Sequence, residues 1–221
     1  MITKPLNEQY CKIDDNGHFL IEIVQPRHAP VFVFLKRFFD IAFSLFLGFL
    51  LIPVILVIAL LVKMDSHGPI IYKQERLGKN GQAFVIFKFR TMDVSAEDDG
   101  PQWARSNDPR CTKIGRMLRK SRLDEIPQLW NIFKGEMSFV GPRPERQCFY
   151  DEFETYIHGF SHRMSVSPGL TGLAQVMGGY DMLPEEKIVY DMEYIKKRSM
   201  MLDLKIIFKT VKLIFTHEGA R

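Results

Sequence analysis

An uncharged run at 41–62 constrains the fold of this chain more than any other feature. These 22 residues contain no Asp, Glu, Lys or Arg. A helix of that length reaches roughly 33 Å at about 1.5 Å per residue, which is enough to cross a hydrocarbon core of about 30 Å. The rest of the sequence has the composition of an ordinary soluble domain. The run therefore predicts a membrane-attached domain and argues against a multi-pass transporter.

Two features of the run leave its topology open. Pro53 lies near its middle, where it removes a backbone donor and clashes with the carbonyl of Phe49, so we expect a kink. Basic residues flank both ends, Lys36 and Arg37 before the run and Lys63 after it, so the positive-inside rule gives no orientation. A spanning helix agrees with these residues, and so does a re-entrant helix that bends at Pro53 and returns to the same face.

The whole chain predicts an α+β, mainly helical fold in three parts. These are a loosely packed N-terminal arm at 1–35, a membrane helix at 36–66 and a small cytosolic domain at 67–221. Short strands are expected at 70–72 and 83–89, around a turn at Gly78 and Gly81. Helices are expected at 111–120, 121–133, 145–160, 184–197 and 202–215.

Charge and cysteine content exclude other classes. The chain has 30 Lys and Arg against 26 Asp and Glu, a formal charge of +4, which does not indicate a nucleic-acid-binding protein. Its three cysteines are far apart and form no CxxC pair. That pattern favours reduced thiols in a cytosolic compartment over a disulfide framework.

The C-terminal segment is amphipathic and predicts a second membrane contact. Apolar residues recur at three- and four-residue steps on one helical face: Leu204, Ile207, Phe208, Val211, Ile214 and Phe215. Lysines at 205, 209 and 212 fall on the other face. This suits an interfacial helix with snorkelling lysines, and a core-packing helix with a solvated basic face is the alternative.

A strongly basic stretch at 105–122 precedes two adjacent carboxylates. It holds seven Lys or Arg and one acid, and Arg116, Arg119 and Lys120 share a helical face. Such a face suits phosphate groups, although a solvated charge run is the commoner explanation.

Asp124 and Glu125 follow directly. Ser121 is expected to be the N-cap of the next helix, with Asp124 at the capping-box position. The two carboxylates then act either as helix caps or as a nucleophile beside a metal-binding group. The second role needs arginines and Mg²⁺, because an Asp attacks phosphorus only where the phosphate charge is neutralised.

The segments at 116–131 (RMLRKSRLDEIPQLWN) and 135–144 (GEMSFVGPRP) closely resemble the bacterial sugar transferases, which are monotopic phosphoglycosyl transferases. Supporting blocks match in order: KRFFD at 36–40, QERLG at 74–78, KFRTM at 88–92, PGLTGLAQ at 168–175 and YDMEY at 190–194. The resemblance runs from about residue 36 to residue 215, and it implies a small catalytic form of the family.

The resemblance implies a reaction. The family transfers a sugar-1-phosphate from a nucleotide-sugar donor, usually a UDP-sugar, to undecaprenyl phosphate, giving a polyprenyl diphosphate-sugar and UMP. This step initiates exopolysaccharide or O-antigen-type synthesis at the cytoplasmic face of the bacterial inner membrane. The partners expected are therefore the donor, undecaprenyl phosphate and the lipid bilayer, with no nucleic acid and with a homo-oligomer left open.

The resemblance also implies roles for single residues. Asp124 matches the nucleophile that forms a covalent phosphosugar ester, and Glu125 matches the residue that helps hold Mg²⁺. Pro53 matches the break of a re-entrant membrane helix. Phosphate- or nucleotide-side contacts are implied at Lys88, Arg90 and Arg143, and more weakly at Asp191. The basic helical face described above adds Arg119 as a candidate for binding phosphate.

Two departures and two alternatives remain. After Gln175 the family often has Asn-Gly-Arg, whereas this chain has VMGG at 176–179, so the sugar is not identified; Ile52 stands where some relatives have Ser before the proline. A membrane-tethered scaffold that binds anionic lipid without catalysis predicts salt-dependent liposome binding and no turnover. A carboxylate-pair glycosidase is disfavoured, because its two acids must flank a bond from opposite sides.

Overall fold

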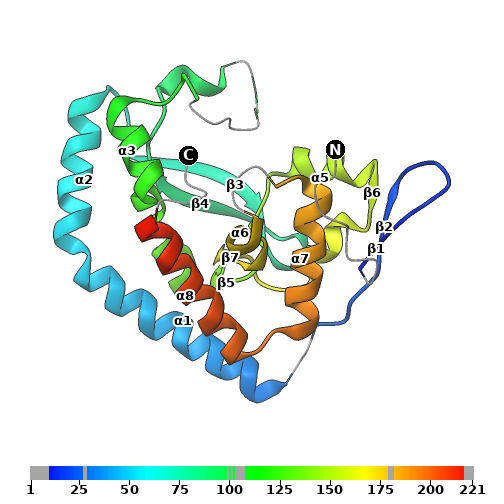
Figure 1. Cartoon of the computed structure of the whole chain (residues 1–221). Coiled ribbons are helices and arrows are strands. Elements are labelled where there is room, and N and C mark those ends of the chain that lie inside the picture. The colour runs from blue at the N-terminus through cyan, green and yellow to red at the C-terminus, as the bar shows by residue number, and fades with distance from the viewer. Residues whose placement is uncertain are drawn as a thin grey trace.

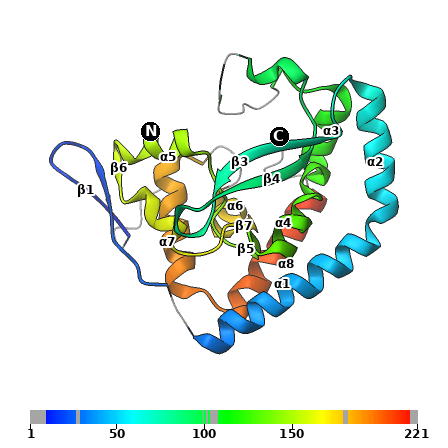
Figure 2. The ribbon, with the colours of Figure 1, turned by 180° about the vertical axis from the view of Figure 1, so that it is seen from behind.

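Two long helices, α1 and α2, meet at a corner and enclose a mixed α/β body on their concave side (Figure 1, Figure 2). The computed structural model describes residues 10–216 except 27–28, 99, 101, 103–107 and 179–181. The helices are α1 Pro30–Leu50, α2 Ile52–Asp65, α3 Lys113–Ser121, α4 Gln128–Lys134, α5 Gln147–Glu154, α6 Leu173–Gly178, α7 Pro184–Lys197 and α8 Met200–Thr216. The fold is mixed and mainly helical, as the sequence predicts.

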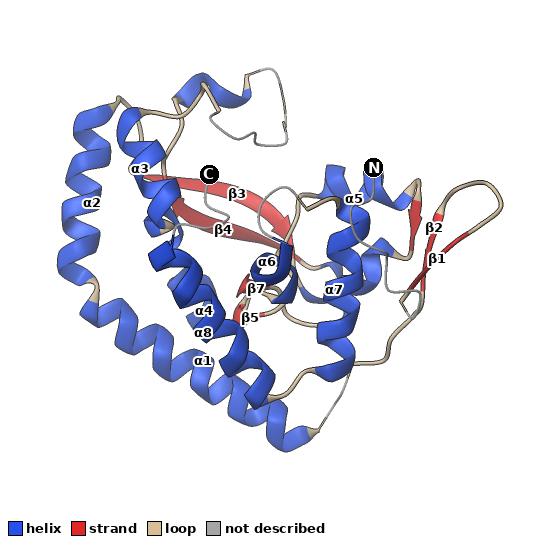
Figure 3. Ribbon diagram, in the orientation of Figure 1, coloured by secondary structure: helices blue, strands red, loops and turns tan. Residues whose placement is uncertain are grey.

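Within the described residues, the strands form three small sheets (Figure 3). They are β1 Cys11–Ile13, β2 Phe19–Ile21, β3 Ile71–Leu77, β4 Ala83–Phe89, β5 Ser138–Val140, β6 Ile157–His158 and β7 Gly169–Thr171. An antiparallel hairpin joins β3 to β4 through the expected turn, where Asn80 and Gly81 have positive φ values of 57° and 75°. β5 pairs in parallel with β7, and β1, β2 and β6 form the third sheet in that order.

The apolar run bends at its centre. The axes of α1 and α2 differ by 63°, and the break falls at Leu51. Pro53 lies in the first turn of α2, where a backbone N–H has no partner within the helix, so the proline is accommodated without a lost bond. The kink expected from Pro53 is therefore present. Among the described residues no single helix has the length and composition of a membrane span, whereas α1 and α2 together do.

Polar side chains fasten the first half of α1 to the body. Arg37 donates to the carbonyls of Ile132 and Phe133 at the end of α4, both at 2.7 Å. Asp40 is 6% exposed and accepts a hydrogen bond from Ser138 Oγ at 3.1 Å. These charged groups lie on the inner side of α1, where they satisfy backbone groups that would otherwise be buried without partners.

Lys36 joins α1 to a buried network between α7, α8 and β5. Its Nζ donates to Asp203 Oδ2 at 2.6 Å and to the carbonyl of Val140 at 2.9 Å. The hydroxyl of Tyr194 donates to Asp203 Oδ1 at 2.9 Å and lies 3.1 Å from the same carbonyl. One carbonyl at the end of β5 is thus held from two helices.

The end of α2 is fastened to the same body. The buried guanidinium of Arg90 donates to the carbonyl of Ser66 at 2.7 Å and lies 3.4 Å from that of Val62, so it caps the helix C-terminus. Asp65 accepts the backbone N–H of Ile114 at the start of α3, at 3.1 Å. Both ends of the apolar helix pair therefore dock on one domain.

The outer faces of the pair are apolar and exposed. Phe49 is 78% exposed and Met64 is 74% exposed. Other exposed side chains on these helices are Val31, Phe34, Phe38, Phe46, Leu56, Val57 and Leu60. Exposed apolar side chains in this number on two adjoining helices are typical of a surface that contacts another apolar phase or a partner.

Helix α8 also has one buried and one exposed face. Asp203 and Ile206 are buried against the body. The outward strip is apolar, with Met201, Leu204, Phe208 and Val211 exposed, and the expected lysines at 205, 209 and 212 are exposed beside it. The predicted apolar face is thus divided, because Ile207 and Ile214 are only partly exposed.

The expectations for the N-terminal arm and for the helix at 145–160 are wrong. The described part of the N-terminal arm is not loosely packed, because Tyr10, Cys11, Ile21 and Val24 belong to the main hydrophobic core. The helix expected at 145–160 ends at Glu154, and the following residues form β6 against β2. Both errors arise from long-range strand pairing that local sequence patterns do not encode.

Candidate active site

A tight turn between α3 and α4 carries Asp124 and Glu125. Arg122 has the left-handed conformation (φ 57°) that ends α3, and residues Leu123–Glu125 form a short 3₁₀ turn. Ser121 is the last residue of α3, and its hydroxyl donates to the carbonyl of Met117 at 2.9 Å. The expected N-cap at Ser121 and the continuous helix at 121–133 are therefore wrong, because the reversal at Arg122 separates the two helices.

Apolar neighbours hold this turn against the end of α2. Leu123 and Ile126 pack on a cluster that contains Ile58, Val62 and Leu118. Asp124 and Glu125 lie between these two apolar anchors in sequence. Glu125 forms ion pairs with Lys88 of β4 and Arg143 of the β5–α5 loop, and the charges of the same two cations act on Asp124.

Glu125 lies between two cations that come from different elements. Its Oε1 accepts from Lys88 Nζ of β4 at 3.0 Å and from Arg143 Nη2 of the loop after β5. Burial alone would raise the pKa of Glu125, but the charges of Arg143 and Lys88 more than offset it and hold the net pKa well below its usual range. Glu125 is therefore ionised at any physiological pH.

Asp124 has the opposite electrostatic character. It is 7% exposed, and burial raises its pKa from 3.8 to about 6, with Glu125 adding to the rise. The charges of Lys88, Arg119 and Arg143 limit the increase. Adjacent carboxylates with pKa values moved in opposite directions are typical of sites in which two acids have different roles.

Close backbone packing positions Arg143. A Cβ on Gly141 would lie 2.4 Å from the carbonyl oxygen of Ser167, and a Cβ on Gly169 would lie 2.1 Å from the Gly141 nitrogen. The Gly169 N–H donates to the carbonyl of Pro142 at 2.8 Å. Only glycine fits at these two positions, so the loop that carries Arg143 is held tightly against the start of β7.

The other basic residues predicted for the site lie in different positions. Arg119 Nε donates to Thr91 Oγ1 at 2.9 Å, and its charge is among those that act on Asp124, so Arg119 lies near the pair. Arg90 instead caps the C-terminus of α2. Arg105 lies outside the described residues.

Asp191 has a different partner from the carboxylate pair. It forms an ion pair with Arg163 Nη2 at 2.7 Å, and both side chains are 2% exposed. Burial raises the pKa of Asp191, while Arg163 opposes the rise. The charges that act most strongly on Asp124 and Glu125 do not include it.

Sequence reasoning missed several residues that support the site. Asn131, fully buried, donates to the carbonyl of Val85 at 2.7 Å and accepts the N–H of Phe87 at 3.2 Å, which fixes β4 against α4. Arg76 pairs with Glu145 at 3.0 Å, just after the Arg143 loop. Both lie in or beside the quoted motifs, but nothing in the sequence reveals their partners.

The donor set at the carboxylate pair fits Mg²⁺. This ion prefers oxygen ligands and usually takes one or two protein carboxylates together with substrate phosphates. Both contacts of Glu125 use Oε1, and within the described ranges no hydrogen bond or ion pair involves Oε2. Glu125 Oε2 and the Asp124 carboxylate are thus suitable oxygen donors.

Comparison with known proteins gives concordant matches. The bacterial sugar transferase family matches residues 31–217. The UDP-N-acetylgalactosamine-undecaprenyl-phosphate N-acetylgalactosaminephosphotransferase of Aeromonas hydrophila is 42% identical over 196 residues, which are 87% of this chain and 46% of that protein. The UDP-glucose:undecaprenyl-phosphate glucose-1-phosphate transferase of Escherichia coli (strain K12) is 41% identical over 210 residues, 93% of this chain and 45% of that protein.

The length covered differs among the relatives. This chain spans less than half of the two proteins above. A UDP-glucose:undecaprenyl-phosphate glucose-1-phosphate transferase of Caulobacter vibrioides is 40% identical over 192 residues, which are 84% of this chain and 71% of that protein. The match covers the turn with Asp124 and Glu125 and the helices that enclose it, and this chain belongs to the bacterial sugar transferase family.

Proposed function

We propose that this chain transfers a sugar-1-phosphate from a UDP-sugar to undecaprenyl phosphate and so initiates synthesis of a bacterial glycan. The observation that carries the proposal is the buried Asp124, with its raised pKa, beside a Glu125 that is held ionised between Lys88 and Arg143. The names of the three relatives describe transfer to undecaprenyl phosphate from UDP-linked sugars.

The first half-reaction transfers the phosphosugar to the protein. An oxygen of ionised Asp124 attacks the phosphorus that carries the sugar, and the bond from that phosphorus to the bridging oxygen breaks. UMP leaves with the electron pair of that bond, and the phosphosugar remains as an ester of Asp124. Lys88 and Arg143 lie where they counter the charge of the diphosphate, which otherwise repels an anionic nucleophile.

The second half-reaction regenerates the carboxylate. A phosphate oxygen of undecaprenyl phosphate attacks the same phosphorus, the bond to Asp124 breaks, and the polyprenyl diphosphate-sugar forms. When bound at Glu125 and Asp124, Mg²⁺ supplies further neutralisation of phosphate charge. No proton transfer is needed in either step if Asp124 starts ionised, so uptake of a proton by Asp124, whose pKa is raised to about 6 by burial in the metal-free chain, opposes the first step at acid pH.

We also propose that α1 and α2 form a re-entrant hairpin at the cytoplasmic face of the inner membrane. The support is that both ends of the pair dock on one domain, through Lys36 and Arg37 at one end and Arg90 at the other. A spanning arrangement would place the two ends on opposite sides of the bilayer, whereas these contacts join both ends to one body. The exposed strip of α8 and its lysines suit the same interface.

The reaction is tested with the full chain in detergent, Mg²⁺, undecaprenyl phosphate and a panel of nucleotide-sugars. We expect release of UMP from one or more UDP-sugars and a complete loss in Asp124→Asn. Asp151→Asn, an exposed change on α5, is the matched control and should keep full activity. Full activity of Asp124→Asn would end the nucleophile assignment.

Three further outcomes separate the alternatives. Salt-dependent liposome binding with no turnover of any donor supports the lipid-binding scaffold and overturns the transferase. Mass spectrometry without undecaprenyl phosphate should show the wild-type chain, but not Asp124→Asn, gaining the mass of one phosphosugar. Turnover that survives chelation of Mg²⁺ contradicts the metal assignment.

The topology of the helix pair is tested by labelling cysteines separately from each side of the membrane. Ala29→Cys and His67→Cys place single thiols at the two ends of the helix pair, in a background where the exposed Cys148 is replaced by Ser. Both thiols should react with an impermeant reagent in inside-out membrane vesicles and neither should react in intact cells. Labelling of one end from each side would establish a spanning topology.

A further inference from the structure

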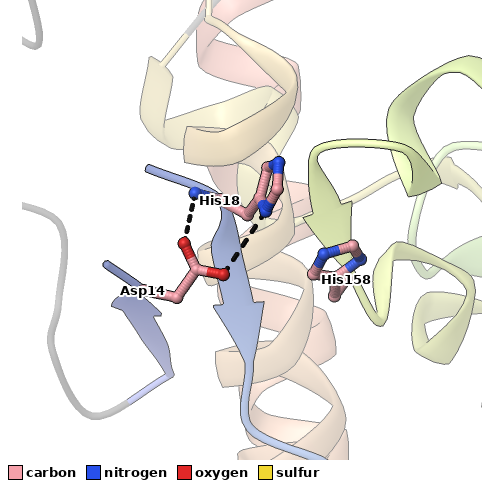
Figure 4. A group of neighbouring side chains, drawn as sticks. All are labelled: Asp14, His18 and His158. Carbon is pink, nitrogen blue, oxygen red and sulfur yellow. Dashed lines mark hydrogen bonds and ion pairs between the residues drawn. The ribbon is translucent and has the colours of Figure 1, made fainter. Parts of the chain in front are cut away.

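Three possible metal ligands lie together where the N-terminal hairpin meets the body (Figure 4). Asp14 and His18 belong to the turn between β1 and β2, and His158 is the last residue of β6. β2 and β6 pair in parallel with Leu20 opposite His158, which brings residues far apart in the sequence to one place. This cluster has no part in the proposed transfer reaction.

The ligand atoms of the three side chains are close enough to share one ion. One carboxylate oxygen and one ring nitrogen from each histidine lie within 4.8 Å of one another. Asp14 Oδ2 is 3.3 Å from His18 Nδ1, and the two imidazole rings have centroids 5.1 Å apart. Metal–ligand bonds of about 2.0–2.2 Å allow ligand atoms up to about 4 Å apart, so small side-chain rotations complete the site.

The backbone of the turn orients Asp14. Its Oδ1 accepts the N–H groups of Asn16 at 2.9 Å and His18 at 2.8 Å, which leaves Oδ2 directed toward the imidazole (Figure 4). Gly17, with φ of 83°, provides the left-handed residue that this turn requires. Hydrogen bonds to the second oxygen of a ligating carboxylate are a common support of metal sites, because they fix the ligand before the ion binds.

We propose that Asp14, His18 and His158 bind one divalent transition-metal ion of the Zn²⁺ type. Two imidazole nitrogens and one carboxylate oxygen suit borderline ions such as Zn²⁺ and do not suit Mg²⁺, which takes oxygen ligands in octahedral geometry. His158 is exposed and the other two side chains are partly exposed, so water completes the coordination shell.

The ion would join the hairpin to the body at a second point. The hairpin already contributes Tyr10, Cys11 and Ile21 to the hydrophobic core. A bound ion ties the solvent-exposed end of the hairpin to β6 and so favours the closed arrangement over local opening. The site is therefore structural, and its occupancy is separate from phosphosugar transfer.

The test measures Zn²⁺ binding to the full chain without a polyhistidine tag, by competition with a chromogenic chelator. Excess Mg²⁺ is present throughout so that the carboxylates at 124 and 125 do not take up Zn²⁺. We expect one equivalent to bind, and His158→Gln and Asp14→Asn should each weaken binding at least about tenfold. His67→Gln, an exposed histidine remote in sequence from the cluster, is the matched control and should bind as the wild type does.

Amide hydrogen exchange provides an independent readout. Zn²⁺ should slow exchange in the hairpin of the wild-type chain and of His67→Gln, but not in His158→Gln. Absence of Zn²⁺ binding in the folded wild-type chain overturns the proposal, and so does equal binding by His158→Gln. Since the UMP-release assay does not enter the measurement, failure here leaves the proposed transferase activity untouched.

Discussion

Two acid–cation clusters in this protein differ in solvent exposure and in the balance of their charges. Asp191 and Arg163 form a one-to-one pair in which both side chains are 2% exposed. Glu125 faces two cations, Lys88 and Arg143, whose side chains are 20% and 33% exposed. The first cluster is closed to solvent, whereas the second has an excess of positive charge and an accessible side. We therefore expect a reactive carboxylate at the second cluster and a structural ion pair at the first.

The largest effect expected from breaking the closed pair is on stability. Asp191→Asn leaves Arg163 buried without an anion, which should cost about 3–5 kcal/mol in the free energy of unfolding. Thermal unfolding in detergent measures this loss. Turnover per folded molecule should change little, and the double variant with Arg163→Met should recover part of the stability. If Asp191→Asn stays fully stable but is inactive, Asp191 acts in the active site.

Breaking the open cluster should act on turnover instead. Glu125→Gln keeps the size of the side chain but removes the charge between Lys88 and Arg143 and one oxygen ligand suited to Mg²⁺. UMP release should fall about 10²–10³-fold, which corresponds to about 3–4 kcal/mol. Glu152→Gln on the exposed side of α5 is the control. If Glu125→Gln lowers stability and leaves turnover unchanged, this cluster is structural, as the Asp191–Arg163 pair is.

Asp124→Asn sharpens the contrast, because we expect it to stabilise the fold. A rise in pKa from 3.8 to about 6 means that the ionised carboxylate destabilises the native state above pH 6, by on the order of 2–3 kcal/mol. The folded protein binds the proton more tightly than the unfolded chain, so this destabilisation disappears as pH falls below about 4. The variant should unfold at a higher temperature than wild type at pH 8 and at the same temperature at pH 4.

The smallest effect expected is a shift of the pH–rate profile. Activity of the wild type should fall below about pH 6 as Asp124 takes up a proton. The charge of Lys88 lowers the pKa of Asp124, so Lys88→Met should move this acid limb to higher pH. Lys73→Met, at an exposed position of β3, should leave the profile unchanged. If the acid limb of the pH–rate profile does not shift in Lys88→Met, a group other than Asp124 controls that limb.

Much of the framework could be predicted from the sequence. The uncharged run and Pro53 indicate a bent helix pair, and the bend occurs at Leu51, two residues away. The helix expected at 184–197 is α7, and the strand expected at 83–89 is β4. These elements have strong local signals, namely hydrophobic periodicity and Pro or Gly boundaries, and tertiary contacts do not override them.

The site was only partly predictable. The adjacent Asp124 and Glu125 and the resemblance around them indicate the carboxylates, but the opposite pKa shifts depend on Lys88 and Arg143, which lie far away in the sequence. Arg90 and Asp191 have the residue types of a phosphate site yet serve as a helix cap and a closed ion pair. A sequence motif identifies the residues, whereas the fold determines which residues each of them contacts.

The network around Lys36 has a mechanical consequence. Its ammonium group holds the carbonyl of Val140, three residues before Arg143, while it also pairs with Asp203 of α8. Helix α1, helix α8 and the strand that leads into the arginine loop are thus joined at one ammonium group. If α1 rests on the bilayer as proposed, this group couples the depth of that helix to the position of the loop that carries Arg143.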